Sequence, residues 1–231
     1  VVWRAERFEM LDSMEVDFNQ IETECAGAGL SDGRAGDGEY LIRDCVAVIC
    51  LLREKSSGEK IIVVSGHLFW DPRANDVKLL QAWWLLKKLE EFSTKSTGAR
   101  ILLAGDFNSV PGSTVVNLIC RGCFNPGEDS EAVSPRLQEW LRLDENQFEV
   151  GFSSVYQSKY VSNFTEGFSG MIDYIMAQSG STFASPLETF DVPCVDELKS
   201  GGLCGIPSHM WPSDHFAIGA KLCFCEKASK N

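Results

Sequence analysis

The sequence lacks an excess of basic residues. Its 21 Lys and Arg are outnumbered by 33 Asp and Glu, which gives a formal net charge of -12 over 231 residues. A chain of this charge has no global positive field that would hold a nucleic acid. Any binding of a polyanion must therefore be local, and acidic regions that bind phosphates commonly do so through a divalent cation. With 44% hydrophobic residues, the chain has enough apolar material for one or at most two globular domains.

Long apolar runs are missing too. No stretch of the sequence approaches the roughly 18 consecutive apolar residues that a membrane-spanning helix needs. We therefore expect no membrane partner.

The cysteines do not form an evident disulfide framework, because there are nine of them, an odd number. Cys45, Cys50, Cys223 and Cys225 lie within apolar runs, where a thiol behaves as a small buried hydrophobe. This usage indicates a reducing intracellular environment, the cytoplasm first, with the nucleus or an organelle as alternatives. The lone C-x-x-C motif at residues 120–123 does not predict zinc, because a zinc site needs two properly spaced pairs.

Short apolar runs and one long amphipathic stretch alternate along the chain. The residues Asn75–Phe92 predict a helix that packs on a sheet, with Asn75 or Asp76 as its cap, and Ser113 predicts the cap of a short helix that extends to Ile119. Runs rich in Val, Ile and Leu predict strands, the last of them more loosely patterned: Val46–Leu52, Ile61–Ser65, Ile101–Ala104, Met171–Met176 and Phe216–Phe224. Residues 26–39, 125–136 and 179–208 have loop compositions. The fold class is therefore α/β.

Polar residues stand at the ends of these apolar runs. His67 follows the second run, and Asp106 and Asn108 follow the third, two residues apart, so that an extended backbone would direct both the same way. Asp173 lies within the fourth run, which is a poor place for an unpaired charge. Asp214 and His215 precede the last run.

Each of these positions also has an ordinary structural interpretation. A histidine after a strand is usually a loop or core residue, and Asp106 with Asn108 is typical of a capped turn. Asp173 is compatible with a simple ion pair, and the Asp214–His215 segment with a plain turn. Taken together, however, these residues are those that metal-assisted hydrolysis of a phosphate ester requires: carboxylates for a hard cation such as Mg²⁺, imidazoles for phosphate oxygens, and an acid for the attacking water.

Four motifs carry a resemblance to a known family. They are His67–Pro72 with the helical stretch Asp76–Gln81, Gly105–Pro111, Met171–Ile175 and Pro212–Phe216. In order and spacing they resemble the endonuclease/exonuclease/phosphatase superfamily, and within it the branch of the deadenylases, nocturnin and Angel. The stretch Arg7–Asn19 also resembles the segment that precedes this region in that branch. The resemblance implies a two-sheet, four-layer α/β sandwich, formed here as a single nuclease-like domain over residues 1–231.

The resemblance also implies roles for the site residues. Asp106 would position the nucleophilic water, His67 would stabilise charge on the phosphate, and Asp173 would orient His215, which donates to the phosphate. Asn108 would contact both the scissile phosphate and the metal, for which Asp106 and Asp214 would be further ligands. The implied ion is Mg²⁺, with Mn²⁺ as an alternative. Pro72 and Phe168 would flank adenine bases, although Phe168 is equally compatible with an ordinary hydrophobic anchor.

Part of the family pattern is not found in this sequence. The family has an Asn near its first strand and a metal-binding Glu in a Leu-Gln-Glu-Val type motif, and Leu137-Gln138-Glu139 does not replace it because it follows the Asp-x-Asn motif. The runs Val46–Leu52 and Ile61–Ser65 would then belong to a first sheet without its opening strands, and so with an unpaired edge. We expect the chain to be a fragment of a longer polypeptide, or to dock a partner chain that completes the sheet.

The sequence is compatible with two classes of function. The first is a Mg²⁺-dependent phosphodiesterase, in particular a 3′-exoribonuclease that acts on poly(A) RNA, with NADP(H) phosphates and cyclic phosphate RNA ends as alternative substrates. The second is a catalytically silent relative that serves as a structural subunit of an RNA–protein assembly. The five intact catalytic-type positions favour the enzyme. The missing Glu would favour a catalytically silent protein only if the chain truly begins at residue 1.

Overall fold

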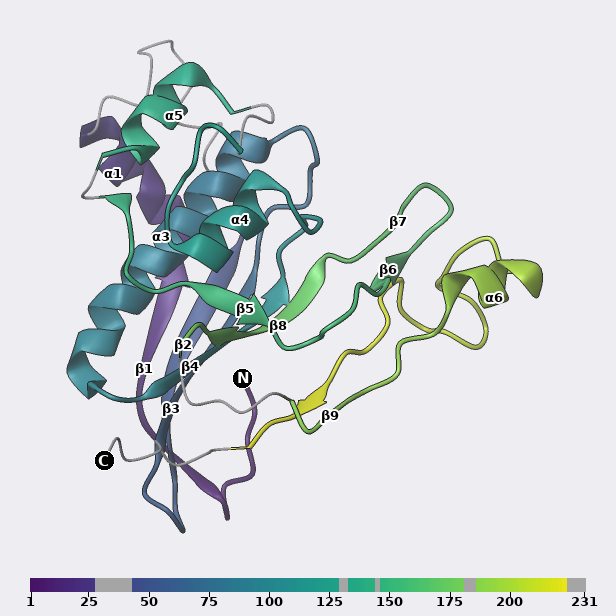
Figure 1. Cartoon of the computed structure of the whole chain (residues 1–231), viewed down its shortest axis with the longest axis horizontal. Coiled ribbons are helices and arrows are strands. Elements are labelled where there is room, and N and C mark those ends of the chain that lie inside the picture. Colours follow the sequence, from purple (N-terminus) through teal and green to yellow (C-terminus); the bar gives the residue numbers. More distant parts are fainter. Residues whose placement is uncertain (28–42, 129–132, 144–145, 181–185, 224–231) are drawn as a thin grey trace.

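The protein is described by a computed structural model of the 231-residue chain (Figure 1). The structure describes residues 1–27, 43–128, 133–143, 146–180 and 186–223. Among these residues, none of the helices combines the length and the apolar character needed to cross a bilayer.

A six-stranded mixed sheet forms the centre of the molecule. Its strands lie in the order β1-β2-β3-β4-β8-β5, and all neighbours are antiparallel except β3 and β4, which are parallel. The strands are β1 (Phe8–Asp17), β2 (Val46–Glu54), β3 (Lys60–His67), β4 (Arg100–Asp106), β8 (Asp173–Gln178) and β5 (Phe152–Ser154).

Four of the five predicted strands are confirmed, with small shifts at their ends. The fourth begins at Asp173 rather than at Met171, so the aspartate opens the strand instead of lying within it. The fifth prediction is wrong. Phe216 is buried in a separate small core, and of the described residues in this run only Ala220–Lys221 form a strand, β10, which pairs with β9 (Glu188–Thr189). Phe224 lies outside the described residues.

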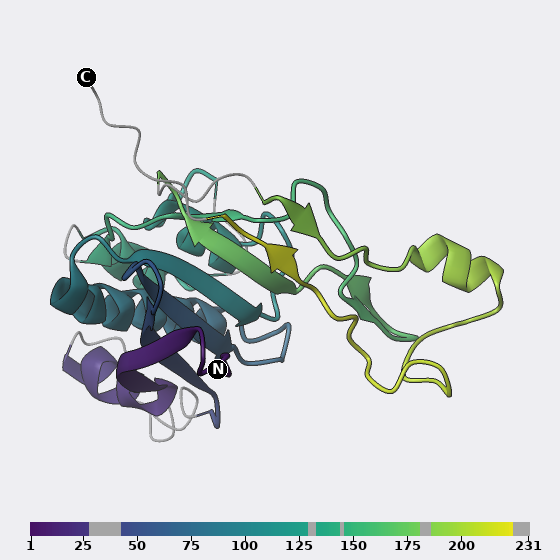
Figure 2. The same ribbon diagram turned by 90° about the horizontal axis from the view of Figure 1, so that it is seen from below.

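Helices cover one face of the sheet (Figures 1 and 2). The main one is α3 (Asn75–Ser93), which has a broad buried surface that includes Leu79, Trp83 and Leu86 and which carries the chain between the parallel strands β3 and β4. Beside it lies α4 (Thr114–Arg121). The other helical elements of the described residues are η1 (Phe18–Gln20), α1 (Ile21–Gly27), η2 (Thr94–Ser96), α5 (Pro135–Leu141) and α6 (Val195–Ser200).

The caps of the two main helices were predicted with unequal success. Ser113 caps α4 as expected, because its Oγ accepts the N–H of Val116 at 3.4 Å. Helix α3 instead begins after Ala74, without a side-chain cap. The carboxylate of Asp76 is used elsewhere, since it accepts the backbone N–H of Ser134 at 3.1 Å.

The predicted loops contain more structure than their composition indicated. Residues 125–136 include the start of α5, where Pro135 occupies a first-turn position that suits proline. Residues 179–208 include β9 and α6. The prediction for residues 26–39 falls mostly outside the described residues, although residues 26 and 27 belong to α1.

The opposite face of the sheet carries half-buried apolar side chains, and no helix of the described residues covers it. Val48, Val63 and Leu102 lie on this open face, around a small cluster that includes Cys50 and Leu52. The edge of the sheet on the β2 side is β1, which was not among the predicted strands. β2 and β3 both lie inside the sheet, because β1 covers β2, and the uncovered apolar surface is a face.

A projecting arm follows β5 and continues after β8 (Figure 1). It contains the two-stranded sheet of β6 (Asn163–Phe164) and β7 (Ser169–Gly170), helix α6, and the β9–β10 pair. Its own core consists of Phe164, Val195, Ile206 and Phe216. The arm brings the C-terminal segment back to the edge of the central sheet.

Candidate active site

Three site residues lie in one row across the central sheet. His67 is paired with Asp106 in the parallel ladder of β3 and β4, and Asp106 is paired with Asp173 in the antiparallel ladder of β4 and β8. Residues directly opposite one another place their side chains on the same face. The register of the sheet therefore brings His67, Asp106 and Asp173 together, although 106 residues separate the first from the last.

His215 joins this row from the C-terminal segment. Its Nδ1 lies 2.7 Å from Oδ2 of Asp173, and its Nε2 lies 3.8 Å from Oδ2 of Asp106. On the other side, Oδ2 of Asp106 lies 3.6 Å from Nε2 of His67. Ligand atoms of Asp106, Asp173 and His215 all lie within 4.8 Å of one another. The predicted convergence of distant segments is thus present.

Asn108 contacts both Asp106 and His67. Its backbone has a positive φ of 45°, a conformation that asparagine tolerates better than most residues, and its N–H donates to Oδ1 of Asp106 at 2.8 Å. Its Nδ2 donates to the carbonyl of Leu68 at 2.9 Å and lies 3.1 Å from Nε2 of His67. The capped-turn interpretation was therefore correct as local geometry, and the turn also serves the site.

The arm supports the segment that carries His215. Asn163 forms an isolated β-bridge with His215, and the N–H of Phe164 donates to the carbonyl of Asp214 at 3.1 Å. Oδ2 of Asp214 lies 4.0 Å from Nε2 of His215 and accepts Nδ2 of Asn163 at 3.5 Å. Asp214 thus stands beside the cluster, as predicted.

The electrostatics of the cluster favour a bound positive charge. Burial raises the pKa of Asp106, and the neighbouring carboxylate of Asp173 raises it further, against the opposing effects of the Asn108 N–H and the two imidazoles. Burial works against a charged imidazole at His215, but the hydrogen bond to Asp173 and the surrounding carboxylates outweigh it, so the pKa of His215 is raised. A cation beside these acids would be stabilised.

The two predicted base-stacking residues lie on loops. Pro72 is exposed between β3 and α3, and Phe168, which is 42% exposed, lies in the turn between β6 and β7 on the arm. Their exposure suits contact with a ligand, and their role stays a prediction.

Three further residues that touch the site were missed from the sequence. The hydroxyl of Tyr160 donates to the carbonyl of Asp173 at 2.6 Å, and Oγ of Ser162 accepts the N–H of Asp173 at 3.0 Å. Lys78, which is 4% exposed, donates from Nζ to the carbonyl of Asn108 at 3.1 Å. For Lys78 a signal was available, because a lysine on the apolar side of a helix needs a partner. Tyr160 and Ser162 lie in a polar stretch without any pattern.

The cysteines do not change this account. Six cysteines of the described residues form no disulfide: Cys45, Cys50, Cys120, Cys123, Cys194 and Cys204. In the part of the chain that the structure describes, the grouping of possible metal ligands contains no cysteine.

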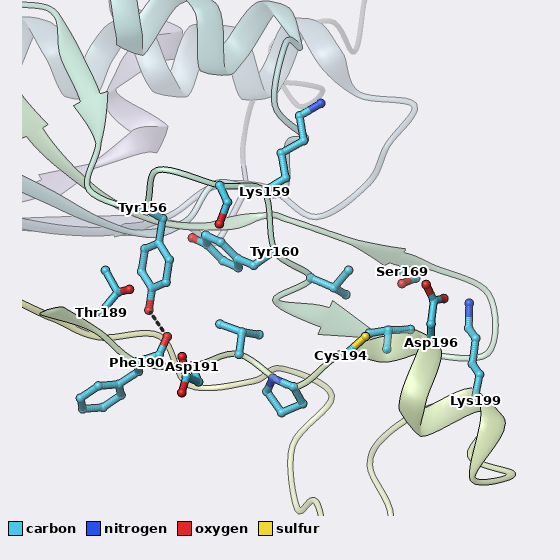
Figure 3. A pocket seen from close by; sticks show the side chains of 15 residues that line it. Tyr156, Lys159, Tyr160, Ser169, Thr189, Phe190, Asp191, Cys194, Asp196 and Lys199 are labelled. Atoms are coloured by element: carbon cyan, nitrogen blue, oxygen red, sulfur yellow. Dashed lines mark hydrogen bonds between the residues drawn. The ribbon is translucent and has the colours of Figure 1, made fainter.

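Described residues close to the row line two clefts. One, of about 460 Å³, is bounded by the arm and by the loop after β5, and Figure 3 shows Tyr156, Tyr160 and Phe190 along it. Tyr160, which lines this cleft, also donates to the carbonyl of Asp173. The other, of about 490 Å³, lies on the β1–β3 side, where His67 and Ser65 line it.

Comparison with known proteins agrees with this geometry. Residues 32–215 match the Endonuclease/Exonuclease/phosphatase family. The chain belongs to this family, and its mixed α/β fold is of the corresponding type. It is 32% identical over 98% of its length to the probable CCR4-Not complex 3′-5′-exoribonuclease subunit Ccr4 of Encephalitozoon cuniculi, of which it covers 44%. It is also 32% identical over 95% of its length to carbon catabolite repressor protein 4 homolog 4 of Arabidopsis thaliana, of which it covers 53%. The chain thus spans about half the length of these relatives.

Solved structures show the same fold. ANGEL2, described as a 2′,3′-cyclic phosphatase, matches with a TM-score of 0.71 at 23% identity over 95% of this chain and 68% of that one. The human nocturnin catalytic domain matches with a TM-score of 0.58 at 18% identity over 96% of this chain and 62% of that one.

Proposed function

We propose that this chain provides the catalytic cluster of a divalent-metal-dependent phosphodiesterase, and specifically of a 3′-exoribonuclease that hydrolyses poly(A) RNA. The observation that carries the proposal is the convergence of His67, Asp106, Asp173 and His215 within hydrogen-bond and ion-pair distances. The relatives named as 3′-5′-exoribonuclease subunits favour RNA as the substrate.

The residues at the cluster fit a Mg²⁺ ion. Mg²⁺ prefers oxygen ligands and is usually held by one or two carboxylates. Asp106 offers a half-buried carboxylate with a raised pKa, and Asp214 offers a carboxylate 4.0 Å from Nε2 of His215. Asn108, whose N–H bonds Asp106, carries a side-chain amide oxygen as a further donor to the metal. Mn²⁺ accepts the same ligands. The ion, when bound, supplies a positive charge for the phosphate oxygens and a more acidic water.

The side chains of the cluster would carry out the proton transfers and contact the phosphate. Asp106 accepts a proton from, or orients, the water that attacks the phosphorus. As the new bond forms, the bond from phosphorus to the 3′-oxygen of the preceding ribose breaks, and that oxygen takes up a proton from solvent water. His67 donates to a phosphate oxygen on which charge develops. His215 donates from Nε2 to the phosphate, while Asp173 holds Nδ1 and stabilises the charged imidazole. Such preorganised donors commonly contribute a hundredfold or more to the rate.

Exposed rings offer a place for the bases. Phe168, in the β6–β7 turn of the arm, and Pro72, after β3, are exposed on loops, and stacking on one base contributes about 1–3 kcal/mol. This local gain would offset the unfavourable net charge of -12. We propose that these two residues contact adenine bases.

The open face of the central sheet offers a surface on which a further polypeptide segment can pack. Its half-buried apolar side chains include Val48 and Val63, and such a face gains free energy when it is covered. We propose that a further polypeptide segment, from the same protein or from a partner chain, packs there.

The test is hydrolysis of a 5′-labelled, A-tailed RNA by the protein in Mg²⁺, with a parallel reaction in EDTA. We expect stepwise shortening from the 3′ end, its loss with EDTA, and a fall of at least about a hundredfold for Asp106→Ala. Glu139→Ala serves as the matched control, because Glu139 lies on α5 and has no proposed role; this variant keeps the wild-type rate.

Parallel reactions separate the substrate from the chemistry. An RNA with a 2′,3′-cyclic phosphate end and NADPH are offered under the same conditions. One of these two substrates could be turned over in a chelator-sensitive reaction while the A-tail is not shortened. That result would contradict the assignment as an exoribonuclease, but the proposal of a metal-dependent hydrolase would still hold. No turnover of any of the three would contradict the enzyme and favour a silent structural subunit.

A further inference from the structure

We propose that Tyr160 and Ser162 are positioning residues for the Asp173–His215 pair. Through their hydroxyl groups they hold the peptide groups of Asp173, and through its own backbone Ser162 ties Asp173 to the segment that carries His215. The inference rests on the proposed function, which gives the Asp173–His215 pair its role in phosphate-ester hydrolysis.

Asp173 needs such support because it begins a strand that is paired only on one side at this point. β4 accompanies β8 as far as the Asp106–Asp173 pair. On the other side, β5 pairs only with residues 176–178, and a last backbone bond joins the N–H of Val155 to the carbonyl of Ile175 at 2.9 Å. Beyond Val155 the chain leaves the sheet for the arm, and among the residues that the structure describes no strand continues the ladder beside Asp173.

Two hydroxyl groups take the place of the missing strand. Oγ of Ser162 accepts the backbone N–H groups of both Ile172 and Asp173 at 3.0 Å, and the Tyr160 hydroxyl donates to the Asp173 carbonyl at 2.6 Å. Ser162 is 0% exposed. Both peptide groups of Asp173 thus have partners, as buried backbone groups require.

The backbone of Ser162 reaches the other half of the pair. Its carbonyl accepts the N–H of Phe216 at 2.7 Å, and the next residue, Asn163, forms the bridge with His215. One short segment therefore contacts both Asp173 and His215, which lie 42 residues apart in the sequence. The strength of their 2.7 Å hydrogen bond depends on distance and angle, so a shift of either backbone weakens it.

The ring of Tyr160 is itself held in place. Its centroid lies 4.4 Å from that of Tyr156, which also lines the cleft in Figure 3. The hydroxyl of Tyr156 contacts the carbonyl of Gly219 at 2.9 Å and that of Phe190 at 3.2 Å. Tyr156 thus resembles Tyr160 in its surroundings, but its hydroxyl bonds backbone groups other than those of Asp173, which makes it a natural control.

The first test is a double-mutant cycle on the hydrolysis of A-tailed RNA. Tyr160→Phe removes only the hydroxyl and leaves no cavity, and Ser162→Ala removes the acceptor. We expect each to lower kcat about tenfold with little change in KM, because a small misplacement of a catalytic group is costly. In an Asp173→Asn background, neither should lower kcat further, since both act through Asp173.

Additive losses would overturn the proposal, because they would show that the hydroxyls act independently of Asp173. Tyr156→Phe and Ser57→Ala are the controls; Ser57 lies in the β2–β3 turn, at the far end of the strand that carries His67. Both should keep the wild-type kcat, even where they lower the melting temperature. A tenfold loss in Tyr156→Phe would also overturn the proposal, because any hydroxyl of the arm would then have the same effect.

The second test does not depend on activity. In protein with ¹⁵N-labelled histidine, the Nδ1 proton of His215 that is bonded to Asp173 is expected as a separate downfield NMR signal at fixed pH. We expect it to be shifted or lost in Tyr160→Phe and Ser162→Ala and kept in Tyr156→Phe and Ser57→Ala. An unchanged signal in all four variants would contradict the positioning role. An inactive wild type that still shows this pattern would contradict the proposed function alone.

Discussion

Asp106 and Asp173 occupy directly opposed positions in β4 and β8, so that two carboxylates stand side by side on one face of the sheet. Together with burial, this raises the pKa of Asp106. An arrangement of this kind costs folding free energy and is typical of a site that holds a cation or moves a proton.

The first prediction concerns the stability of that arrangement. Because the folded-state pKa of Asp106 is raised, its ionised form destabilises the folded protein above the ordinary pKa of the group, and the effect vanishes at lower pH, where the group is protonated in both states. In EDTA at neutral pH, Asp106→Asn should therefore melt a few degrees higher than the wild type, about the shift expected for a change of this kind.

Differential scanning calorimetry in EDTA and in Mg²⁺ measures this effect. Mg²⁺ should raise the melting temperature of the wild type, because a ligand of the folded state stabilises it, and should have little effect on Asp106→Asn. A variant that melts lower than the wild type in EDTA would contradict the like-charge account.

The second prediction concerns the buried ammonium of Lys78. Burial lowers the pKa of Lys78, and its Nζ holds the carbonyl of Asn108 at 3.1 Å. Lys78→Met keeps the length of the side chain but removes this donor. We expect hydrolysis to fall about tenfold because Asn108 is displaced, while the melting temperature changes little, since replacing a buried charge by an apolar side chain is often neutral.

Lys88→Met is the matched control for this change. Lys88 lies on the same helix and pairs with Glu91 at the surface, so its loss should leave hydrolysis unchanged. Equal rates for Lys78→Met and the wild type would show that Asn108 does not depend on the ammonium.

The third prediction concerns pH and the β2–β3 turn. Hydrogen bonds from Ser56 and Ser57, assisted by Arg7, lower the pKa of Glu54 to about 2. A depressed carboxyl pKa stabilises the fold above the unfolded-state value, and this stabilisation is lost as pH falls through the folded-state pKa. Glu54→Gln should therefore be less stable than the wild type at neutral pH, and the difference should shrink towards about pH 2. Urea denaturation at both ends of this range measures it, and a difference independent of pH would contradict the assignment.

The central strands could be predicted because their apolar runs are buried on at least one face. β2, β3 and β4 are short and rich in Val, Ile and Leu, and His67 and Asp106 stand at the ends of β3 and β4. Since those ends pair in register, their proximity follows from the order of the strands.

Other features depend on tertiary contacts that no local pattern records. Phe216 reads as the start of a strand but fills the small core of the arm, and Asp76 reads as a cap but bonds Ser134. The approach of His215 to Asp173 depends on the arm, and only the family resemblance pointed to it. Ser162 carries no signal, because its importance arises from the missing strand beside Asp173.

The most direct test of the common site uses Mn²⁺ as a paramagnetic probe in NMR spectra of ¹⁵N-histidine-labelled protein. The chain has three histidines, His67, His209 and His215, and two of them lie at the cluster, so the third is an internal control. At substoichiometric Mn²⁺ we predict that the signals of His67 and His215 broaden together and before that of His209, and that Asp106→Asn abolishes this. Broadening of only one of the two, or of His209 first, would contradict a single metal and phosphate site.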